Sequence, residues 1–212
     1  MSERGAGAAG RWRLYGGRLC LDFANTVEPR EAEPYRDTLG GYADLVRWAR
    51  GLGALDDATA ARLLRTAADR QDAAATSFAA AITLREATYR AFAAIAHGAA
   101  PAAADLETLQ QAYAEAMRHA HLRPGSAQLA WAWEDDELDR AWWPVARSAV
   151  ELATAGELDR VKQCASSGGC GWLFYDTSKN RIRRWCSMGE CGAQTKAKRQ
   201  TARRRASRTQ TG

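Results

Sequence analysis

Four of the five cysteines in this 212-residue chain fall within a window of 28 residues. They are Cys164, Cys170, Cys186 and Cys191. Zinc is commonly held by four thiolates at the corners of a tetrahedron, and such a site can stabilise a small segment that has little core of its own. The window therefore predicts a structural zinc site, with Zn²⁺ as the cofactor and these four side chains as its ligands.

The segments between these cysteines predict how the first pair is brought together. Gly168 and Gly169 allow a tight turn there, because glycine tolerates positive φ. Residues 171–175 alternate as a strand does, residues 176–180 have turn chemistry, and residues 181–185 are predicted to return as a second strand. The module therefore begins with a knuckle and a β-hairpin.

The second pair of cysteines predicts a helix after the hairpin. On a regular helix Cys186 and Cys191 would point about 140° apart and could not share one face. We therefore expect Cys186 to precede the helix and Cys191 to lie near its first turn. Trp172 and Trp185 are expected to pack the zinc core, with stacking on bases as the alternative. A knuckle, a hairpin and a helix in this order form a treble-clef or zinc-ribbon-like module.

Charge is divided unevenly along the chain. Residues 1–158 carry 17 Lys and Arg against 22 Asp and Glu, whereas residues 159–212 carry 13 against 3. The net charges of the two parts are therefore −5 and +10. An acidic body followed by a basic end indicates a partner made of phosphates, which is a nucleic acid.

Six basic side chains are predicted to contact that nucleic acid. Three of them recur at helical spacing after Cys191, and a helix with this much like charge is better explained by an anionic partner than by its own stability. The alternative is a solvated helix face. The predicted set is Arg183, Arg184, Lys196, Lys198, Arg199 and Arg203. DNA is the favoured partner, with RNA as the alternative, because no element in the sequence is specific to one of them.

Upstream of the zinc module, the apolar residues recur mainly at helical spacing. A turn at Pro124-Gly125, followed by alternating Leu129, Trp131 and Trp133, predicts a small β-hairpin among the helices. The fold class is therefore mainly α. The predicted domains are a helical domain at residues 1–158 that senses a signal or forms a homodimer, a zinc module at residues 159–206, and a disordered basic tail at residues 207–212.

Asp22 and Asn25 are polar residues within an apolar segment of the helical domain. They are expected to cap neighbouring backbone or to line a pocket for a small-molecule effector. The sequence contains no Ser/His/Asp, HExxH or phosphate-loop pattern, so we predict that the protein is not an enzyme. An enzyme in the helical domain, with the zinc module as an accessory, is the alternative.

The sequence also bears on location. Residues 1–10 contain no apolar run typical of a signal peptide, and no segment approaches the roughly 20 apolar residues of a membrane span. We expect a cytoplasmic protein with no membrane partner. In a reducing compartment, clustered cysteines are more often metal ligands than disulfides, which agrees with the zinc prediction.

Several stretches of the sequence resemble a known pair of domains. Arg160-Val-Lys-Gln-Cys164, the run from Cys170 to Asn180, Arg183-Arg-Trp-Cys-Ser-Met188 and Cys191-Gly192 are similar to the CGNR zinc finger. The run from Gly16 to Thr26 and the run from Tyr42 to Ala49 resemble the ABATE domain that precedes it.

This resemblance implies a bacterial, stress-related transcription regulator, or in other descriptions an RNA-binding protein, whose four cysteines bind zinc. The chain departs from the pattern at Ala193-Gln194, which stands where the family has Asn-Arg, and its first cysteine loop is one residue longer than expected. Any contact made by that family arginine is therefore not carried over to this chain.

Overall fold

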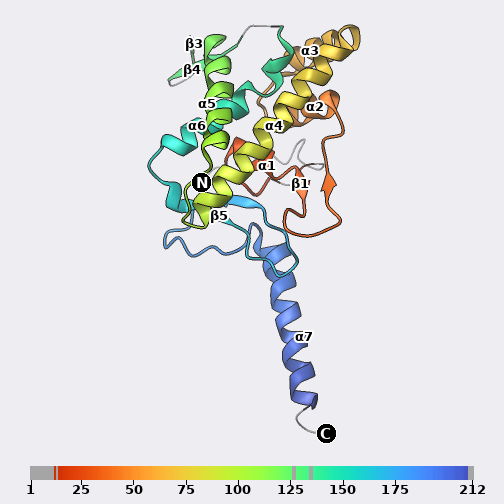
Figure 1. The fold of residues 1–212 in the computed structure, drawn as a ribbon, viewed down its shortest axis with the longest axis vertical. Helices are drawn as coiled ribbons and strands as arrows, with labels where there is room; N and C mark the ends of the chain where they lie inside the picture. Colours follow the sequence, from red (N-terminus) through yellow and green to blue (C-terminus); the bar gives the residue numbers. More distant parts are fainter. Residues whose placement is uncertain (1–11, 13, 126–127, 134–135, 210–212) are drawn as a thin grey trace.

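The computed structural model describes residues 12, 14–125, 128–133 and 136–209 (Figure 1). Its α-helices are α1 (Leu19–Ala24), α2 (Tyr42–Gly51), α3 (Asp57–Asp69), α4 (Gln71–Ala96), α5 (Ala103–Arg118), α6 (Trp143–Thr154) and α7 (Ala193–Thr209). Its strands form three antiparallel pairs, β1 (Val27–Glu28) with β2 (Arg36–Asp37), β3 (His121–Pro124) with β4 (Leu129–Ala132), and β5 (Val161–Gln163) with β6 (Leu173–Tyr175). The predicted fold, mainly α with small hairpins, is confirmed.

The helical body is built around the long helix α4. Helix α5 packs against α4 and α6, and the short α1 contacts both α4 and α6 at the centre of the core. Phe23 and Trp48 meet there, with ring centroids 4.9 Å apart. Among the described residues, no helix is both long enough and apolar enough to cross a membrane.

Local sequence signals set the ends of several helices. The Asp56 side chain caps α3 by accepting a hydrogen bond from the backbone N–H of Thr59 at 2.7 Å. Gly98 takes a φ of 73° just after α4, a conformation that favours glycine. Pro144 lies in the first turn of α6, where its missing N–H costs no helical hydrogen bond, and so it marks the start of this helix.

The predicted hairpin around Pro124-Gly125 is present. Its register pairs Leu122 with Trp131 and Pro124 with Leu129. Residues 126–127, which stand between the two strands in the sequence, lie outside the described residues. Trp133 lies just beyond β4 and is buried in the helical core, where its indole N–H donates to the Ala116 carbonyl at 2.7 Å.

The predicted strand partner in the zinc module is wrong. Residues 173–175 do form a strand, but its partner is β5 rather than residues 181–185, which form a loop. The buried carboxylate of Asp176 explains this loop, because it accepts hydrogen bonds from the backbone N–H groups of Ser178 and Arg183 at 2.9 and 3.0 Å. These bonds fold the chain back locally, so residues 181–185 are not extended and cannot pair with β6.

Strand β6 joins the zinc module to the helical body. Its side chains alternate as predicted: Leu173 and Tyr175 are buried in the helical core, whereas Trp172 and Phe174 pack around the cysteines. Val161 of β5 is also part of the helical core. The predicted boundary between residues 158 and 159 is therefore not a boundary in the packing.

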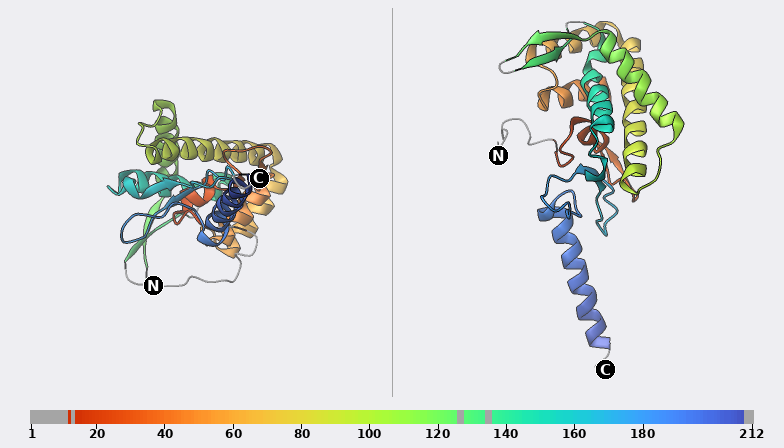
Figure 2. Two further views of the ribbon diagram at one scale, coloured as in Figure 1. Left: turned by 90° about the horizontal axis from the view of Figure 1, so that it is seen from below. Right: turned by 90° about the vertical axis from the view of Figure 1, so that its left-hand side faces the viewer.

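Helix α7 leaves the body and projects away from it, as Figure 1 and the right-hand view of Figure 2 show. It continues to Thr209, whereas the sequence predicts a disordered tail from residue 207. The alanine and arginine residues at 202–206, just before this segment, favour helix, so the helix continues through residue 209. Residues 210–212 of the predicted tail lie outside the described residues.

Candidate zinc centre and basic surface

The four predicted ligands meet at one point of the structure. Their sulfur atoms all lie within 4.8 Å of one another, and the Sγ atoms of Cys170 and Cys191 are each 3.7 Å from that of Cys186. A zinc tetrahedron with Zn–S bonds of about 2.3 Å has edges of about 3.8 Å. The cluster therefore has the dimensions of a zinc site, and zinc is the metal that this module binds.

The four ligands come from three local structures. Cys164 directly follows β5 and Cys170 precedes β6, so one strand pair delivers both. Cys186 ends the loop, and Cys191 lies in a single π-helical turn, Met188–Gly192, that runs into α7. The prediction that Cys186 precedes the helix and Cys191 lies near its first turn is confirmed. The Ser187 hydroxyl caps this turn by accepting from the backbone N–H of Glu190 at 3.3 Å.

The electrostatics of the cluster favour a bound cation. Hydrogen bonds from Cys170 and Cys186 lower the pKa of Cys164, and the bonds to Cys164 in turn raise the pKa of Cys186. The thiols therefore compete for ionisation when no counter-charge is near. A divalent ion would remove this conflict, because a coordinated thiol is deprotonated by the metal.

A loop of the helical domain packs closely on the first knuckle. Arg30 and Glu31 donate backbone hydrogen bonds to the carbonyls of Cys170 and Gly169 at 2.9 and 3.0 Å. Gly169 has a φ of 71°, and a Cβ there would lie 2.6 Å from the Cβ of Ala32. Glycine is therefore required by both the backbone conformation and the close approach of this loop. Positive φ was also predicted at Gly168, but the second such residue is Gly171.

Arg183, which is predicted to contact nucleic acid, is half-buried in the structure. Its guanidinium lies 4.5 Å from the ring centroid of Phe174 and donates hydrogen bonds to the carbonyls of Trp185, at 2.9 Å, and of Cys186. These contacts fix the chain that presents the third zinc ligand. Internal packing therefore accounts for Arg183, and the basic surface is defined without it.

The other five predicted basic residues remain exposed. Arg184 lies in the loop before Cys186, and the other four lie on α7. Arg184, Lys196, Lys198, Arg199 and Arg203 together are called the basic surface. Helix α7 has no acidic residue in its whole length. The zinc cluster holds the first turn of α7, and the helix carries the positive charge away from the acidic body.

Comparison with protein-family models agrees with this architecture. Residues 17–156 match the ABATE model, which is described as a "putative stress-induced transcription regulator". Residues 160–204 match the CGNR zinc finger model. The chain belongs to the family in which an ABATE domain precedes a CGNR zinc finger. No curated protein matches the chain at a significant level.

Within the ABATE domain, Asn25 has a structural role that the sequence left open. Its side-chain amide donates to the carbonyl of Leu173 at 2.8 Å, and its carbonyl oxygen accepts from the N–H of the same residue at 2.9 Å. The indole N–H of Trp172 donates to the carbonyl of Val27 at 2.8 Å. The ABATE domain thus satisfies the free edge of β6 in the zinc finger.

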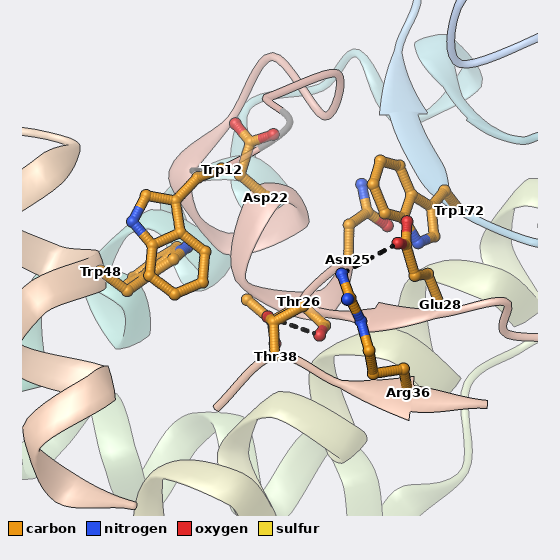
Figure 3. Close-up of a pocket in the computed structure, with 9 residues that line it drawn as sticks. All are labelled: Trp12, Asp22, Asn25, Thr26, Glu28, Arg36, Thr38, Trp48 and Trp172. Carbon is orange, nitrogen blue, oxygen red and sulfur yellow. Dashed lines mark hydrogen bonds and ion pairs between the residues drawn. The ribbon is translucent and has the colours of Figure 1, made fainter. Parts of the chain in front are cut away.

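Asp22, in α1, has a similar role, because it binds the backbone of the loop before this helix. Its carboxylate accepts from the backbone N–H of Gly16 at 2.8 Å, and burial raises its pKa to about 7. Asp22 and Asn25 do border a common hollow with Trp12, Trp48 and Trp172 (Figure 3). The hollow measures about 50 Å³, far less than the roughly 300–1,000 Å³ of typical small-molecule sites. Backbone capping therefore accounts for both residues, and the effector pocket stays a prediction.

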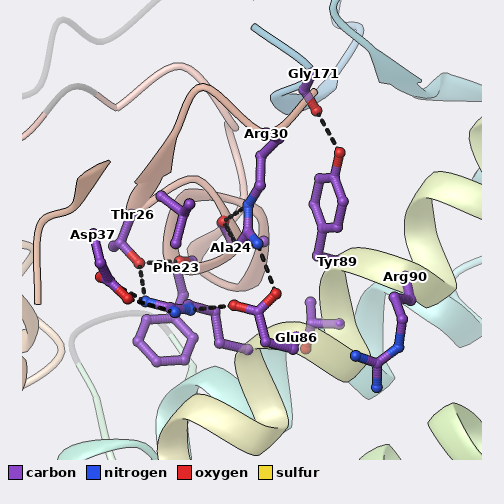
Figure 4. Close-up of polar contacts among 12 residues, drawn as sticks. Phe23, Ala24, Thr26, Arg30, Asp37, Glu86, Tyr89, Arg90 and Gly171 are labelled. Carbon is purple, nitrogen blue, oxygen red and sulfur yellow. Dashed lines mark hydrogen bonds and ion pairs between the residues drawn. The ribbon is translucent and has the colours of Figure 1, made fainter. Parts of the chain in front are cut away.

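A network of ion pairs, which sequence reasoning missed, connects α4 to the loop that packs on the first cysteine knuckle (Figure 4). Arg85 is paired with Asp37 and Glu86, and Glu86 also binds Arg30 at 2.6 Å. The guanidinium of Arg30 lies 4.3 Å from the ring centroid of Tyr89, whose hydroxyl donates to the Gly171 carbonyl at 3.1 Å. Arg85-Glu86, charged residues within a largely apolar helix, were the only signal of this network in the sequence.

Replacing Asn25 with alanine tests the connection between the two domains. The change leaves the buried N–H and carbonyl of Leu173 without partners, and each such group costs about 1–3 kcal/mol. We expect the free energy of unfolding to fall by about 2–4 kcal/mol and zinc to be released faster to a chelator. Urea denaturation and chelator-induced zinc release measure both effects.

Asn180 provides the matched control, because it is an exposed asparagine in the zinc finger loop. Its replacement by alanine should change stability by less than about 0.5 kcal/mol. An Asn25→Ala variant as stable as Asn180→Ala would contradict the structural role of Asn25.

Proposed function

We propose that this protein is a zinc-dependent transcription regulator that binds DNA through α7 and the rest of the basic surface. One observation carries the proposal: α7 projects from the body and carries only basic charges (Figure 1). Its 17 residues span about 25 Å, and the major groove of B-DNA, about 12 Å wide, admits a helix. A helix that is exposed over residues 196–203 and carries only basic charges is better explained by an anionic partner than by its own stability.

The zinc centre would orient this helix. Cys191 ties the turn before α7 to the knuckle, and the Thr195 hydroxyl donates to the Cys191 carbonyl at 2.8 Å inside the first turn. Zinc binding would therefore set the angle at which α7 leaves the body. Loss of the metal would free the helix and raise the entropic cost of binding DNA.

The charge distribution supports an approach of DNA to α7 rather than to the helical domain. Residues 1–158 have a net charge of −5, which disfavours contact between phosphates and the helical domain. We propose that the helical domain senses a signal or forms a homodimer. The β3–β4 hairpin favours the dimer, because Leu122, Leu129 and Trp131 lie on one face of it and are exposed.

We also propose that the protein has no catalytic activity. Among the described residues, the four cysteines are the one cluster of His, Cys, Asp and Glu side chains that could hold a metal. A zinc ion with four thiolate ligands has no open position for a substrate or an activated water. The enzyme alternative would therefore require a site outside the zinc finger.

The RNA alternative is tested by competition. With a labelled DNA duplex bound to the protein, we expect unlabelled duplex DNA to displace it at lower concentrations than duplex RNA of the same sequence. The reason is that the major groove of A-form RNA is too deep and narrow for a helix. Fluorescence anisotropy measures the displacement. Stronger competition by RNA would replace the DNA proposal with the RNA-binding alternative.

A further inference from the structure

We infer that the phosphate backbone of one DNA strand runs along a continuous basic track across the zinc finger, from the base of α7 to the C-terminal end of α4. This inference rests on the proposed DNA binding and adds a second contact region to it. The inference is supported by two adjoining hollows, by the surplus of positive charge in them and by a rigidly held loop.

The first hollow, of about 560 Å³, lies between α7 and the first cysteine knuckle. Its polar lining includes Ser166, Ser167, Arg184, Lys198 and Arg199. The second hollow, of about 690 Å³, lies between the end of α4 and the loop after Asp176, and its lining includes His97, Lys162, Arg181, Ile182 and Arg184.

The two hollows meet at Ala165 and Arg184, which line both of them. The backbone N–H of Ala165 donates to the Arg184 carbonyl at 2.9 Å, so the junction is fixed. The two hollows are therefore adjacent, and the exposed side chain of Arg184 lies where they meet.

Both hollows keep a surplus of positive charge. In the first, Glu31 is the one acidic lining residue against Arg184, Lys198 and Arg199. The second is lined by Lys162, Arg181, Arg183 and Arg184 against Asp159. Asp159 is paired with Arg181, and Lys162 is paired with the buried Asp176 at 2.8 Å, so the surplus there comes from Arg183 and Arg184. Arg181 keeps nearly half of its side-chain surface exposed. An anionic backbone therefore complements both hollows.

The loop that presents these groups is held in one shape. The Asp176 carboxylate is fully buried and binds Lys162 as well as two backbone N–H groups of the loop. Arg181 has a φ of 52°, a conformation that is uncommon for residues other than glycine and persists only where its surroundings enforce it. The loop is thus preorganised, which lowers the entropic cost of binding a partner.

Between the arginines of this loop, Ile182 is 72% exposed. A large apolar side chain gains nothing from solvent at this position. Packing against the sugar rings of a strand whose phosphates contact Arg181 and Arg184 would explain it. Such a strand, rather than a free anion, therefore fits both the charges and the apolar contact.

The first test replaces both arginines of the track, as Arg181→Gln/Arg184→Gln. We expect the log–log slope of duplex-DNA affinity against salt to flatten by about 2, and the affinity near 0.15 M salt to fall about 30-fold. The matched control is Arg47→Gln/Arg118→Gln, which removes two exposed arginines from the helical body and should leave the slope unchanged. Zinc content measured for every variant confirms an intact module.

A variant confined to α7, Lys196→Gln/Arg199→Gln/Arg203→Gln, separates this inference from the proposed function. If the α7 variant flattens the slope and the track variant does not, DNA binding stands and the track is wrong. If neither variant changes the slope, both proposals fail.

Photo-crosslinking gives a second measurement that does not depend on affinity. A benzophenone amino acid at position 182 should crosslink to DNA, whereas the same group at Leu122, exposed on the hairpin of the helical body, should not. Absence of a crosslink at position 182, while the wild-type protein binds DNA, would overturn the track.

Discussion

Replacing Cys186 with serine should abolish zinc binding and unfold the loop between Asp176 and α7 while the helical core stays folded. A structural zinc site contributes on the order of 10 kcal/mol to a module of this size. The loop has little core of its own, since its packing consists mainly of the cysteines with Trp172, Phe174 and Trp185. Strands β5 and β6 should survive, because their inward side chains belong to the helical core.

Two measurements check this expectation. Atomic emission should find one zinc per wild-type chain and none in Cys186→Ser, and amide hydrogen exchange should show protection lost in the loop but kept in α4. Cys20→Ala is the matched control, because Cys20 is buried in the helical core, where burial raises its pKa to about 12. It should keep its zinc. A wild-type protein without metal, or a protected loop in Cys186→Ser, would contradict the zinc site.

The parts of the fold that local chemistry determines could be predicted from the sequence. Asp56 caps α3, Pro144 begins α6, and the alternation around Leu173 separates the core face of β6 from its metal face. The four zinc ligands belong to this class as well, because the chemistry of thiolates leaves few other roles for such a cluster. The cap, the helix start and the alternation act within a few residues of where they are read, whereas the cysteines are identified by their own chemistry.

The remaining features depend on contacts between distant segments. Strand β6 pairs with β5 because Asp176 bends the following loop back on itself, and no periodicity reports such a bend. Arg183 and Arg184 are neighbours with the same chemistry, yet one packs on Phe174 and the other is exposed. Asn25 acts on a residue 148 positions away. Sequence pattern could propose that these side chains matter, but not which partner each one meets.

The second large effect is expected from α7. The five residues of the basic surface, if they contact phosphates, predict a log–log slope of about −4 to −5 for binding to duplex DNA. Lys196→Gln/Arg199→Gln/Arg203→Gln removes three of them from exposed positions of α7, where substitutions cost little folding energy. We therefore expect the slope to flatten by about 3 and the affinity near 0.15 M salt to fall about 100-fold, with melting and zinc content unchanged.

The salt dependence of duplex-DNA binding, compared between the wild-type protein and this α7 variant, tests most directly whether a zinc-anchored basic helix is the DNA-binding element. The predicted result is a steep slope for the wild type and a slope flatter by about 3 for the variant. Salt-independent binding by the wild type, or a variant that binds as tightly at every salt concentration, would show that α7 is a solvated helix with no role in recognition.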